Sequence, residues 1–496
     1  MFTLRASLLL SAASRAISQF VPAPTDLLNA TGFLGLPVRF KEVPTGICEL
    51  DPNVKSYSGY VDVSEDEHIF FWFFEARNTD PSQAPLTAWI NGGPGSSSMI
   101  GIFEGNGPCS IDIDGKVHNN PYSFIRLPDA TCPDYARDIG TCGTYSYPNL
   151  TLTADTTRNA APKFWKTLQG FMGAFPQYSR NAFHFATESY GGLYGPIFSE
   201  YIKAQNALNI SGAQHISLES LSIGNGWFDS LIQHQANYNF TVYPGNTYDY
   251  SPFNAQVQSQ LYNNLYGPGN CVDQIKDCVA RGISETCWSA EKFCTSNVGF
   301  MFDKYSDRNE YDVRELIRDR LPYSPYISYL NRAEVRAAIG AFQNFAHRSL
   351  AVYQAFTLSG DVIREYGSVS AVRKLVEQDI TGTRITCNWL GVEAVADEVN
   401  PPGFSSAGYA NLTTSDNQVH GQVKQAGKFS FVRVYESGHD VSLQQPLAAL
   451  EIFERAINGK DIAVGSQTVG PGFITKGTKK SEYREGSSSM HSRVPS

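Results

Sequence analysis

The chain has 496 residues, of which 42% are hydrophobic and 12% aromatic, and its formal net charge is −9 at pH 7. This hydrophobic content supports a sizeable core and excludes a disordered chain. With 39 basic against 48 acidic residues, the composition gives no indication of a nucleic-acid partner. The length allows about three domains, or one large α/β domain that carries an insertion.

Residues 1–18 have the pattern of a secretory signal peptide. Arg5 precedes a short apolar run at 6–13, and small residues follow up to Ser18. The apolar run is too short to span a bilayer, and the alternative is an ordinary N-terminal helix. No later stretch reaches the apolar length of a membrane span. We therefore expect secretion or delivery to a vacuole-like lumen, without a membrane partner.

Glycosylation signals and cysteines fit the same compartment. Asn-X-Ser/Thr glycosylation sequons arise often by chance, so each one alone is weak evidence of export. Nine cysteines in an exported chain indicate disulfides with one cysteine left over. The five Asn-X-Ser/Thr triplets lie at Asn29, Asn149, Asn209, Asn239 and Asn411.

The first half of the chain alternates strands with helices. Residues 58–63 and 68–74 predict a hairpin, and 85–90 a short apolar strand. Helical spacing of apolar residues follows at 161–174, and a further strand at 182–186 leads into a second helix-like stretch. This alternation predicts an α/β fold with a mostly parallel sheet. We expect the sheet domain to comprise 19–226 and 331–474.

Residues 227–330 lack this alternation and are interpreted as an inserted cap. Its four cysteines have spacings of 7, 9 and 7 residues, whereas zinc sites prefer two to four residues between paired ligands. Two local disulfides are the better interpretation. Strand spacing returns at 429–435, and residues 475–496 have no apolar period, so we expect a disordered tail. The cap cysteines are Cys271, Cys278, Cys287 and Cys294.

Ser189 lies in the segment Thr-Glu-Ser-Tyr-Gly-Gly at 187–192, between the strand at 182–186 and a helix start. A nucleophile elbow places its serine on such a turn, with the hydroxyl exposed above the sheet. Gly191 satisfies the second glycine of Gly-X-Ser-X-Gly, but Thr187 occupies the first. The alternative is a glycine-rich helix entry that binds nothing. Ser189 is therefore a candidate nucleophile.

His439 follows the late strand in the segment Glu-Ser-Gly-His-Asp. In α/β hydrolases the base follows the last strand, in the chain order serine, acid, histidine. The alternative is a surface or packed histidine. Its position 250 residues after Ser189 makes His439 the candidate general base.

Residues 91–95, Asn-Gly-Gly-Pro-Gly, follow an early strand, where these hydrolases supply oxyanion-hole amides. Glycines let the backbone approach an oxyanion closely, and such donors stabilise charge that develops in the transition state. The alternative is a plain turn. A phosphate loop is not expected, because its Lys-Ser/Thr pair is missing.

Four motifs in this order resemble the serine carboxypeptidase family, especially its secreted fungal branch. The resemblance runs over residues 46–456 with gaps. It implies an α/β-hydrolase sheet with helices on both faces and a disulfide-rich cap, which removes C-terminal residues from peptides in mild acid. No metal or cofactor is implied. The motifs lie at 89–98, 186–196, 387–391 and 435–439.

The resemblance also assigns roles to residues. Ser189 resembles the nucleophile and His439 the base, while the backbone amides of Gly93 and Tyr190 resemble the oxyanion hole. Asn91 and Glu188 resemble the pair that holds the substrate's free C-terminal carboxylate. A protonated Glu188 donates to that carboxylate, whereas an ionised one repels it. The cysteine pairing implied is Cys271–Cys294 and Cys278–Cys287.

The sequence departs from the family pattern in three places. The family's second carboxylate-binding glutamate falls at Gly105, with Glu104 one place earlier. A central strand and turn are reduced to Ile125 and Arg126, which predicts unpaired backbone groups in the sheet. The family's triad aspartate falls at Arg384. We assign no triad acid, because Asp440 adjoins His439 and adjacent side chains rarely point together.

Three functions therefore remain open from the sequence. The first is an active serine carboxypeptidase. The second is a catalytically impaired relative, or an incomplete gene product in which the two missing segments were lost. The third is an acyltransferase that uses the same acyl-enzyme and excludes water. The carboxylate that supports His439 distinguishes the first two, and product analysis distinguishes the third.

Overall fold

The structure is a computed structural model that divides into two compact units. The first contains residues 1–183, 201–217 and 324–355, and the second contains 184–200, 218–323 and 356–496. The described residues are 24–124, 129–130, 145–146, 150–179, 182–242, 248, 250–316, 324–365, 368–377, 389–481 and 483–484.

The first unit is built on a mixed sheet in the order β1-β2-β3-β4-β8-β5, with β9 also paired to β4. Its β3 and β4 form the antiparallel hairpin that the sequence predicts. Aromatic and β-branched residues favour strands, and every residue of β4 from Ile69 to Phe74 is buried. The strands are β1 (Leu28–Thr31), β2 (Pro37–Glu42), β3 (Ser56–Ser64), β4 (Glu67–Phe74), β5 (Leu86–Ile90), β6 (Cys109–Ile111), β7 (Val117–Asn119), β8 (Asp129–Ala130) and β9 (Tyr145–Ser146).

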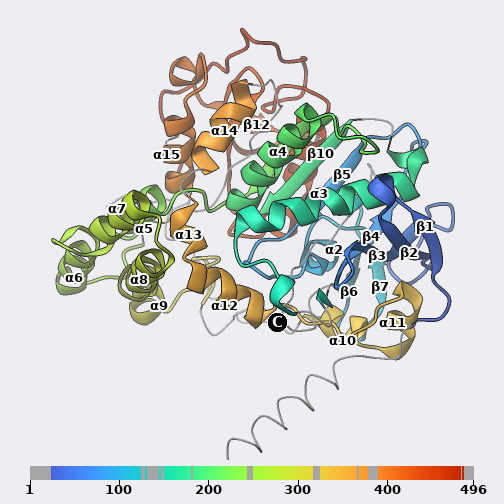
Figure 1. The fold of residues 1–496 in the computed structure, drawn as a ribbon. Coiled ribbons are helices and arrows are strands. Elements are labelled where there is room, and N and C mark those ends of the chain that lie inside the picture. Colours follow the sequence, from blue (N-terminus) through green and yellow to red (C-terminus); the bar gives the residue numbers. More distant parts are fainter. Residues whose placement is uncertain are drawn as a thin grey trace, which may run out of the picture. The chain divides into compact units, whose positions relative to one another are not determined.

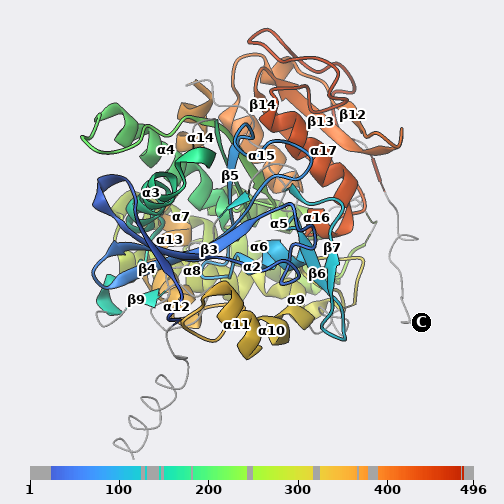
Figure 2. The same cartoon turned by 90° about the vertical axis from the view of Figure 1, so that its right-hand side faces the viewer.

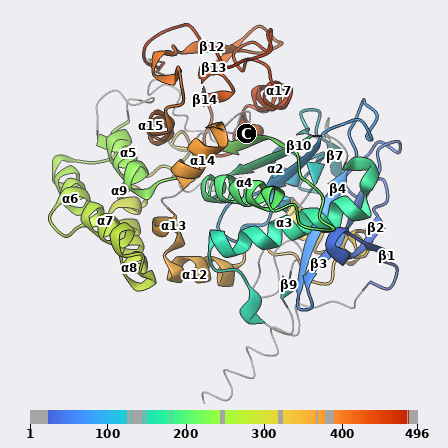
Figure 3. The ribbon, with the colours of Figure 1, turned by 45° about the horizontal axis from the view of Figure 1, so that its top comes forward.

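Helix α3 packs against this sheet, as Figure 3 shows. It begins with a capping box in which Thr156 and Asn159 exchange hydrogen bonds with each other's backbone amides. A Cβ on Gly170 would lie 2.3 Å from Val61 of β3, so the helix approaches the sheet closely at this glycine. The helices of this unit are α2 (Met99–Glu104), α3 (Thr157–Ala174), α10 (Pro325–Leu330) and α11 (Ala333–Ile339), with short turns η1 (Phe33–Gly35), η3 (Leu150–Leu152) and η4 (Pro176–Tyr178).

The short strand β8 corrects the expectation that a central strand is missing. It pairs antiparallel with Phe73 and Phe74 of β4 and parallel with Thr87 and Ala88 of β5. β8 therefore connects β4 to β5 and keeps the sheet continuous, but it is only two residues long. Ile125 and Arg126 lie outside the described residues.

The second unit contains adjacent strands β10 (Phe183–Glu188) and β11 (Leu218–Gly224), with α4 (Gly191–Ala207) directly after β10. Helices α5 to α9 gather into one lobe (Figure 1). Both implied disulfides, Cys271–Cys294 and Cys278–Cys287, form in this lobe. The helices are α5 (Ser230–Val242), α6 (Ala255–Tyr266), α7 (Cys271–Arg281), α8 (Ser284–Cys294) and α9 (Met301–Tyr305), with η5 (Thr295–Gly299).

The core of this lobe extends beyond residue 330, because Ile363 packs with Leu261, Leu265 and Ile275. The boundaries 227–330 of an inserted cap stay a prediction. The later elements are α12 (Leu350–Ser359), α13 (Asp361–Arg364), α14 (Ser368–Glu377), α15 (Trp389–Val399) and η7 (Phe404–Ser406).

A three-stranded antiparallel sheet follows near the C-terminus. Leu412, Val423 and Val432 form a buried cluster with Ala448 and Ile452 of α17. Figure 2 shows α17 beside the strands of this sheet. The alternating residues of the same strands face the other way, which is the period-two pattern of a sheet. The elements are β12 (Ala410–Thr413), β13 (Val419–Ala426), β14 (Phe429–Val434), α16 (Val441–Gln444) and α17 (Pro446–Ile457).

The expectation of a disordered tail is wrong for residues 475–481. Thr475 is 5% exposed, and its hydroxyl accepts a 2.9 Å hydrogen bond from the Gln425 amide. Thr478 forms a bridge with Tyr409, and the Tyr483 ring stacks on Tyr435 at 3.6 Å between centroids. Polar and aromatic contacts hold this segment, so the absence of an apolar period did not reveal it. Residues 485–496 lie outside the described part.

A third disulfide joins Cys48 to Cys109 in the first unit, a pairing that the sequence left open. Cys132, Cys142 and Cys387 are not among the described residues. Within the described ranges, no helix combines the length and the apolar character needed to cross a bilayer.

Candidate active site

Ser189 lies on the turn between β10 and α4 with a φ of 59°. Left-handed backbone is uncommon for a residue other than glycine and persists only where the surroundings hold it. Here the Ser189 amide donates to Gly224 O at 2.9 Å, and the Ser189 carbonyl accepts from Trp227 N at 2.8 Å. The end of β11 therefore fixes the turn from both sides. This is the geometry of a nucleophile elbow.

The glycines after Ser189 are required by close packing. A Cβ on Gly191 would lie 2.0 Å from the Thr187 hydroxyl oxygen, and one on Gly192 would lie 2.3 Å from Trp227 O. Thr187 is fully buried. The elbow therefore accommodates a threonine at the first motif position because Gly191 leaves room for it.

His439 is held by its backbone, in a loop that follows β14. Its amide donates to Tyr311 O at 2.8 Å, and the Asn225 side-chain amide donates to Gly438 O at 3.0 Å and to His439 O. The imidazole packs edge-on against the Tyr311 ring, with centroids 5.2 Å apart. No sequence pattern indicates Asn225 or Tyr311, because both residues are distant from His439 along the chain.

Two carboxylates lie beside the His439 imidazole. Asp440 Oδ1 is 3.3 Å from His439 Nδ1, so the expectation that Asp440 points away is wrong. This distance is longer than the roughly 2.7–2.9 Å of a charge-assisted hydrogen bond. Glu188, His439 and Asp440 each place a side-chain polar atom within 4.8 Å of the other two. The elbow strand therefore brings Glu188 to the histidine loop.

These carboxylates determine how His439 titrates. Burial lowers the pKa of His439, but the hydrogen bond and charge of Asp440 raise it. The charges of Glu188 and Glu310 add to this effect, and the pKa of His439 lies above its usual value. The imidazolium that forms during acid–base catalysis is thus stabilised locally. Arg384, at the family's aspartate position, is not among the described residues.

Asn91 is oriented by its neighbours in the first unit. Its Oδ1 accepts from Trp89 Nε1 at 2.8 Å and from Gly101 N at 3.1 Å, and it is 4% exposed. Both partners are donors, so they identify this atom as the oxygen and leave the amide nitrogen as the other end of the side chain. That NH₂ group is a donor suited to a carboxylate.

The glycine loop after Asn91 is strongly bent. Gly93 has a φ of 118°, and a Cβ there would lie 2.5 Å from Ser96 N. Only glycine fits this backbone.

Glu104 ends α2, Gly105 follows it, and the Ser324 hydroxyl donates to the Glu104 carboxylate. The structure therefore gives Glu104 a protein partner within its own unit.

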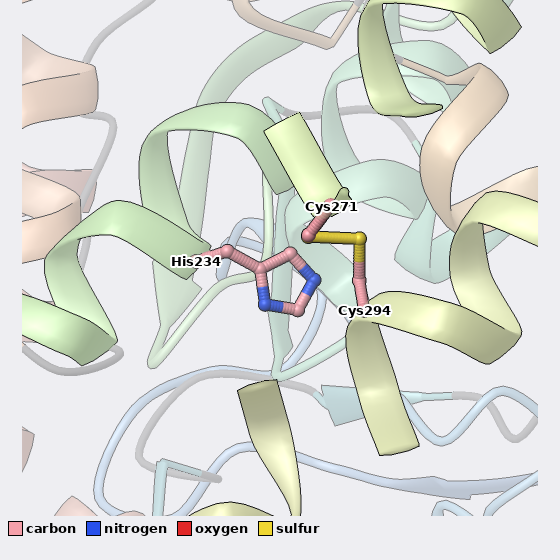
Figure 4. A group of neighbouring side chains, drawn as sticks. All are labelled: His234, Cys271 and Cys294. Carbon is pink, nitrogen blue, oxygen red and sulfur yellow. A yellow bond between two sulfur atoms is a disulfide. The ribbon is translucent and has the colours of Figure 1, made fainter. Parts of the chain in front are cut away.

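One further group of side chains of the types that can bind a metal ion contains His234, Cys271 and Cys294 (Figure 4). The two sulfur atoms are joined in a disulfide, so this group offers no thiolate ligand. Burial lowers the pKa of His234 to about 4, which keeps it neutral beside the disulfide.

The predicted glycosylation sites stay predictions. Asn29, Asn209 and Asn411 are exposed, Asn239 is partly exposed within α5, and Asn149 lies outside the described ranges.

A strand–serine–helix turn on a mixed sheet defines the class: the fold is that of an α/β hydrolase. The sequence profile of the family described as serine carboxypeptidase matches residues 45–459. The chain therefore belongs to the serine carboxypeptidase family, and its enzyme class is that of a serine-type carboxypeptidase, a hydrolase that acts on peptides or proteins.

Individual relatives agree with this assignment. Carboxypeptidase S1 of Penicillium janthinellum is 36% identical, over 84% of this chain and 99% of its own length. Carboxypeptidase S1 homolog B of Arthroderma otae is 34% identical, over 92% of this chain and 82% of its own. The structure of Kex1(delta)p, a prohormone-processing carboxypeptidase from Saccharomyces cerevisiae, gives a TM-score of 0.66 at 20% identity, over 84% of this chain and 95% of that one. This last likeness concerns the fold.

Proposed function

We propose that this chain releases C-terminal residues from peptides through an acyl-enzyme on Ser189, with His439 as the general base. The observation that carries the proposal is the elbow itself: Ser189 holds a φ of 59° between β10 and α4. In addition, its neighbour Glu188 lies within 4.8 Å of the polar atoms of His439 and Asp440. A serine on such a turn, one residue after a side chain that reaches a histidine, suits nucleophilic acyl transfer.

In this mechanism the Ser189 hydroxyl attacks the carbonyl of the scissile bond while His439 accepts its proton. The amides of Gly93 and Tyr190 stabilise the oxyanion, as such donors do in other hydrolases. His439 then returns the proton to the leaving amino group. Water hydrolyses the acyl-enzyme with His439 again as the base.

Substrate polarity follows from Asn91 and Glu188. Two internal donors orient the Asn91 side chain through its oxygen, and we assign Asn91 to binding of the free C-terminal carboxylate. A protonated Glu188 donates to the same group, so binding is expected to favour mild acid. Secretion or a vacuole-like lumen suits such an enzyme and is part of the proposal.

The test combines labelling with substrate pairs. A fluorophosphonate reagent is expected to label Ser189 alone, and Ser189→Ala is expected to lower kcat by about 10⁶. A peptide with a free C-terminus is expected to be cleaved much faster than its C-terminal amide. Labelling at another serine would refute the nucleophile, and equal rates on acid and amide would indicate an endopeptidase or an esterase.

A further inference from the structure

The side chain of Tyr190, the residue after Ser189, has a buried carboxyl partner. Its hydroxyl donates to Asp361 Oδ2 at 2.7 Å, and Tyr190 is 5% exposed. The ring packs edge-to-face on Tyr194 and Phe356, with centroids 5.1 and 5.9 Å away. Burial, and then the charge of Asp361, raise the pKa of Tyr190 well above its usual value. The hydroxyl therefore stays protonated and serves as a donor.

Asp361 itself is fully buried at the start of α13. The position of α13 is fixed by two neighbouring helices. The Ser230 hydroxyl of α5 donates to Val362 O at 2.8 Å. Gly360, with a φ of 69°, lies so close to α8 that a Cβ there would be 2.4 Å from Cys287 Cβ. Asp361 is thus presented to Tyr190 from a rigid, disulfide-linked part of the lobe.

A second buried carboxyl, that of Glu291, interacts electrostatically with Asp361. Glu291 Oε2 is buried and has no hydrogen-bond partner among the described residues. Burial, followed by the charge of Asp361, raises the pKa of Glu291 to about 8. Below that pH Glu291 is neutral. The hydrogen bond from the Tyr190 hydroxyl to Asp361 Oδ2 is established by its geometry, at 2.7 Å.

We propose that Asp361 is a positioning residue for catalysis: by accepting the Tyr190 hydroxyl it fixes the backbone amide that follows Ser189. The inference rests on the proposed function, in which that amide stabilises the oxyanion. Oxyanion donors act only within about 2.7–3.1 Å of the developing charge. Because Tyr has only two side-chain torsions and its ring is enclosed, holding its hydroxyl restrains its main chain. The link joins residues 171 apart in the sequence.

The test removes the hydrogen bond from each side. Tyr190→Phe keeps the ring and deletes the donor, and Asp361→Ala deletes the acceptor, whereas Asp361→Asn keeps an acceptor oxygen. A matched control is Tyr329→Phe, because the Tyr329 hydroxyl is likewise buried and donates to Ile47 O at 2.6 Å. Rates are measured on a free-acid peptide, and active sites are counted with a fluorophosphonate reagent.

We expect Tyr190→Phe and Asp361→Ala each to lower kcat per titrated site about tenfold to hundredfold, less than the roughly 10²–10³ for loss of a whole oxyanion donor. KM is expected to change less than about threefold, because the contact matters in the transition state. The double variant is expected to match the single variants, and Asp361→Asn to retain most of kcat. Tyr329→Phe is expected to lower Tm and leave kcat unchanged.

The outcomes separate the possible failures. An active wild type whose Tyr190→Phe variant loses Tm but keeps kcat overturns the positioning role and makes the hydrogen bond structural. Additive losses in the double variant overturn the coupling of Asp361 to Tyr190. A wild type that neither labels nor turns over overturns the proposed function, and this inference with it.

Discussion

The elbow around Ser189 and the loop around His439 are held by different means. The elbow is held by contacts of the main chain: two backbone hydrogen bonds from the β11 side, and glycines that let α4 touch the Trp227 backbone. The histidine loop is held mainly by side chains: Asn225 donates to Gly438 O and His439 O, and Gln444 Oε1 accepts from Gly438 N. A backbone bond from His439 N to Tyr311 O adds to these contacts. Ser189, the proposed nucleophile, is thus fixed by chain geometry, whereas His439, the proposed base, depends on individual side chains that substitution can remove.

The largest effect is expected from a substitution that breaks the elbow. Gly192→Ala places a Cβ 2.3 Å from Trp227 O, a backbone atom that cannot rotate away. Overpacking of this kind costs about 1–3 kcal/mol of stability. A displacement of about 1 Å at the nucleophile lowers kcat by roughly 10². Chemical unfolding and kinetics per labelled site measure both effects.

Gly470→Ala is the control, because a Cβ there meets no atom within 4 Å. Gly470→Ala is expected to leave the free energy of unfolding and kcat unchanged. A Gly192→Ala enzyme with normal kcat would show that the elbow tolerates movement, contrary to the comparison.

A smaller effect is expected at Asp440, the carboxylate next to His439. Asp440→Asn removes the charge 3.3 Å from Nδ1. Loss of a well-aligned triad acid costs about 10⁴ in kcat, and this contact is long, so we expect a loss of about tenfold to hundredfold. If an acid at position 384, where the family has its triad aspartate, supports His439 better than Asp440 does, Arg384→Asp is expected to raise kcat above that of the wild type.

Asp440→Asn and Arg384→Asp together distinguish positions 440 and 384 as the place of the triad acid. Asp440→Asn with full activity excludes Asp440 as the acid. Arg384→Asp without gain, together with a loss in Asp440→Asn, assigns the role to Asp440.

A still smaller effect is expected from Asn225→Ala, which removes the donor to two loop carbonyls. Hydrogen bonds of this kind contribute about 0.5–1.5 kcal/mol each, and the loosened loop is expected to lower kcat about tenfold. Asn331→Ala is the matched control, since Asn331 donates to Ile327 O and Phe345 O in the first unit. It is expected to lose similar stability without loss of kcat. Equal kcat losses in the two variants would contradict a specific role for Asn225.

The smallest effect concerns the pH dependence of stability and the buried carboxyl of Glu291. Glu291 has a pKa raised to about 8 from an ordinary 4.5, so between these values the unfolded chain has lost a proton that the folded chain keeps. Stability is therefore present below about pH 4.5 and falls as pH rises toward 8. Glu291→Gln is expected to remove about 1–3 kcal/mol of this decline.

Melting curves from pH 5 to 8 check this prediction. The Tm difference between Glu291→Gln and the wild type should grow in favour of the variant as pH rises. A constant difference would show that Glu291 is ionised in the folded chain across this range.

The sequence predicted what local patterns encode. The elbow at 187–192, the hairpin of β3 and β4 and the helix α3 each depend on neighbouring residues, and the resemblance supplied the two lobe disulfides. Contacts such as Asn225 with His439, or Tyr190 with Asp361, join distant parts of the chain and leave no periodic signal. The packed segment at 475–481 was missed for the same reason, since hydrogen bonds rather than apolar spacing hold it.

That segment also bears on how such an enzyme survives its own chemistry. An enzyme that removes residues one by one from free C-termini meets its own chain ends at high local concentration. Thr475 accepts a hydrogen bond from Gln425 N, Thr478 is bridged to Tyr409, and the Tyr483 ring stacks on the Tyr435 ring. An extended substrate strand cannot be drawn from this region without breaking those contacts. Self-digestion is therefore expected to stop there, and aged preparations should converge on one shortened mass whose last residue lies near Tyr483.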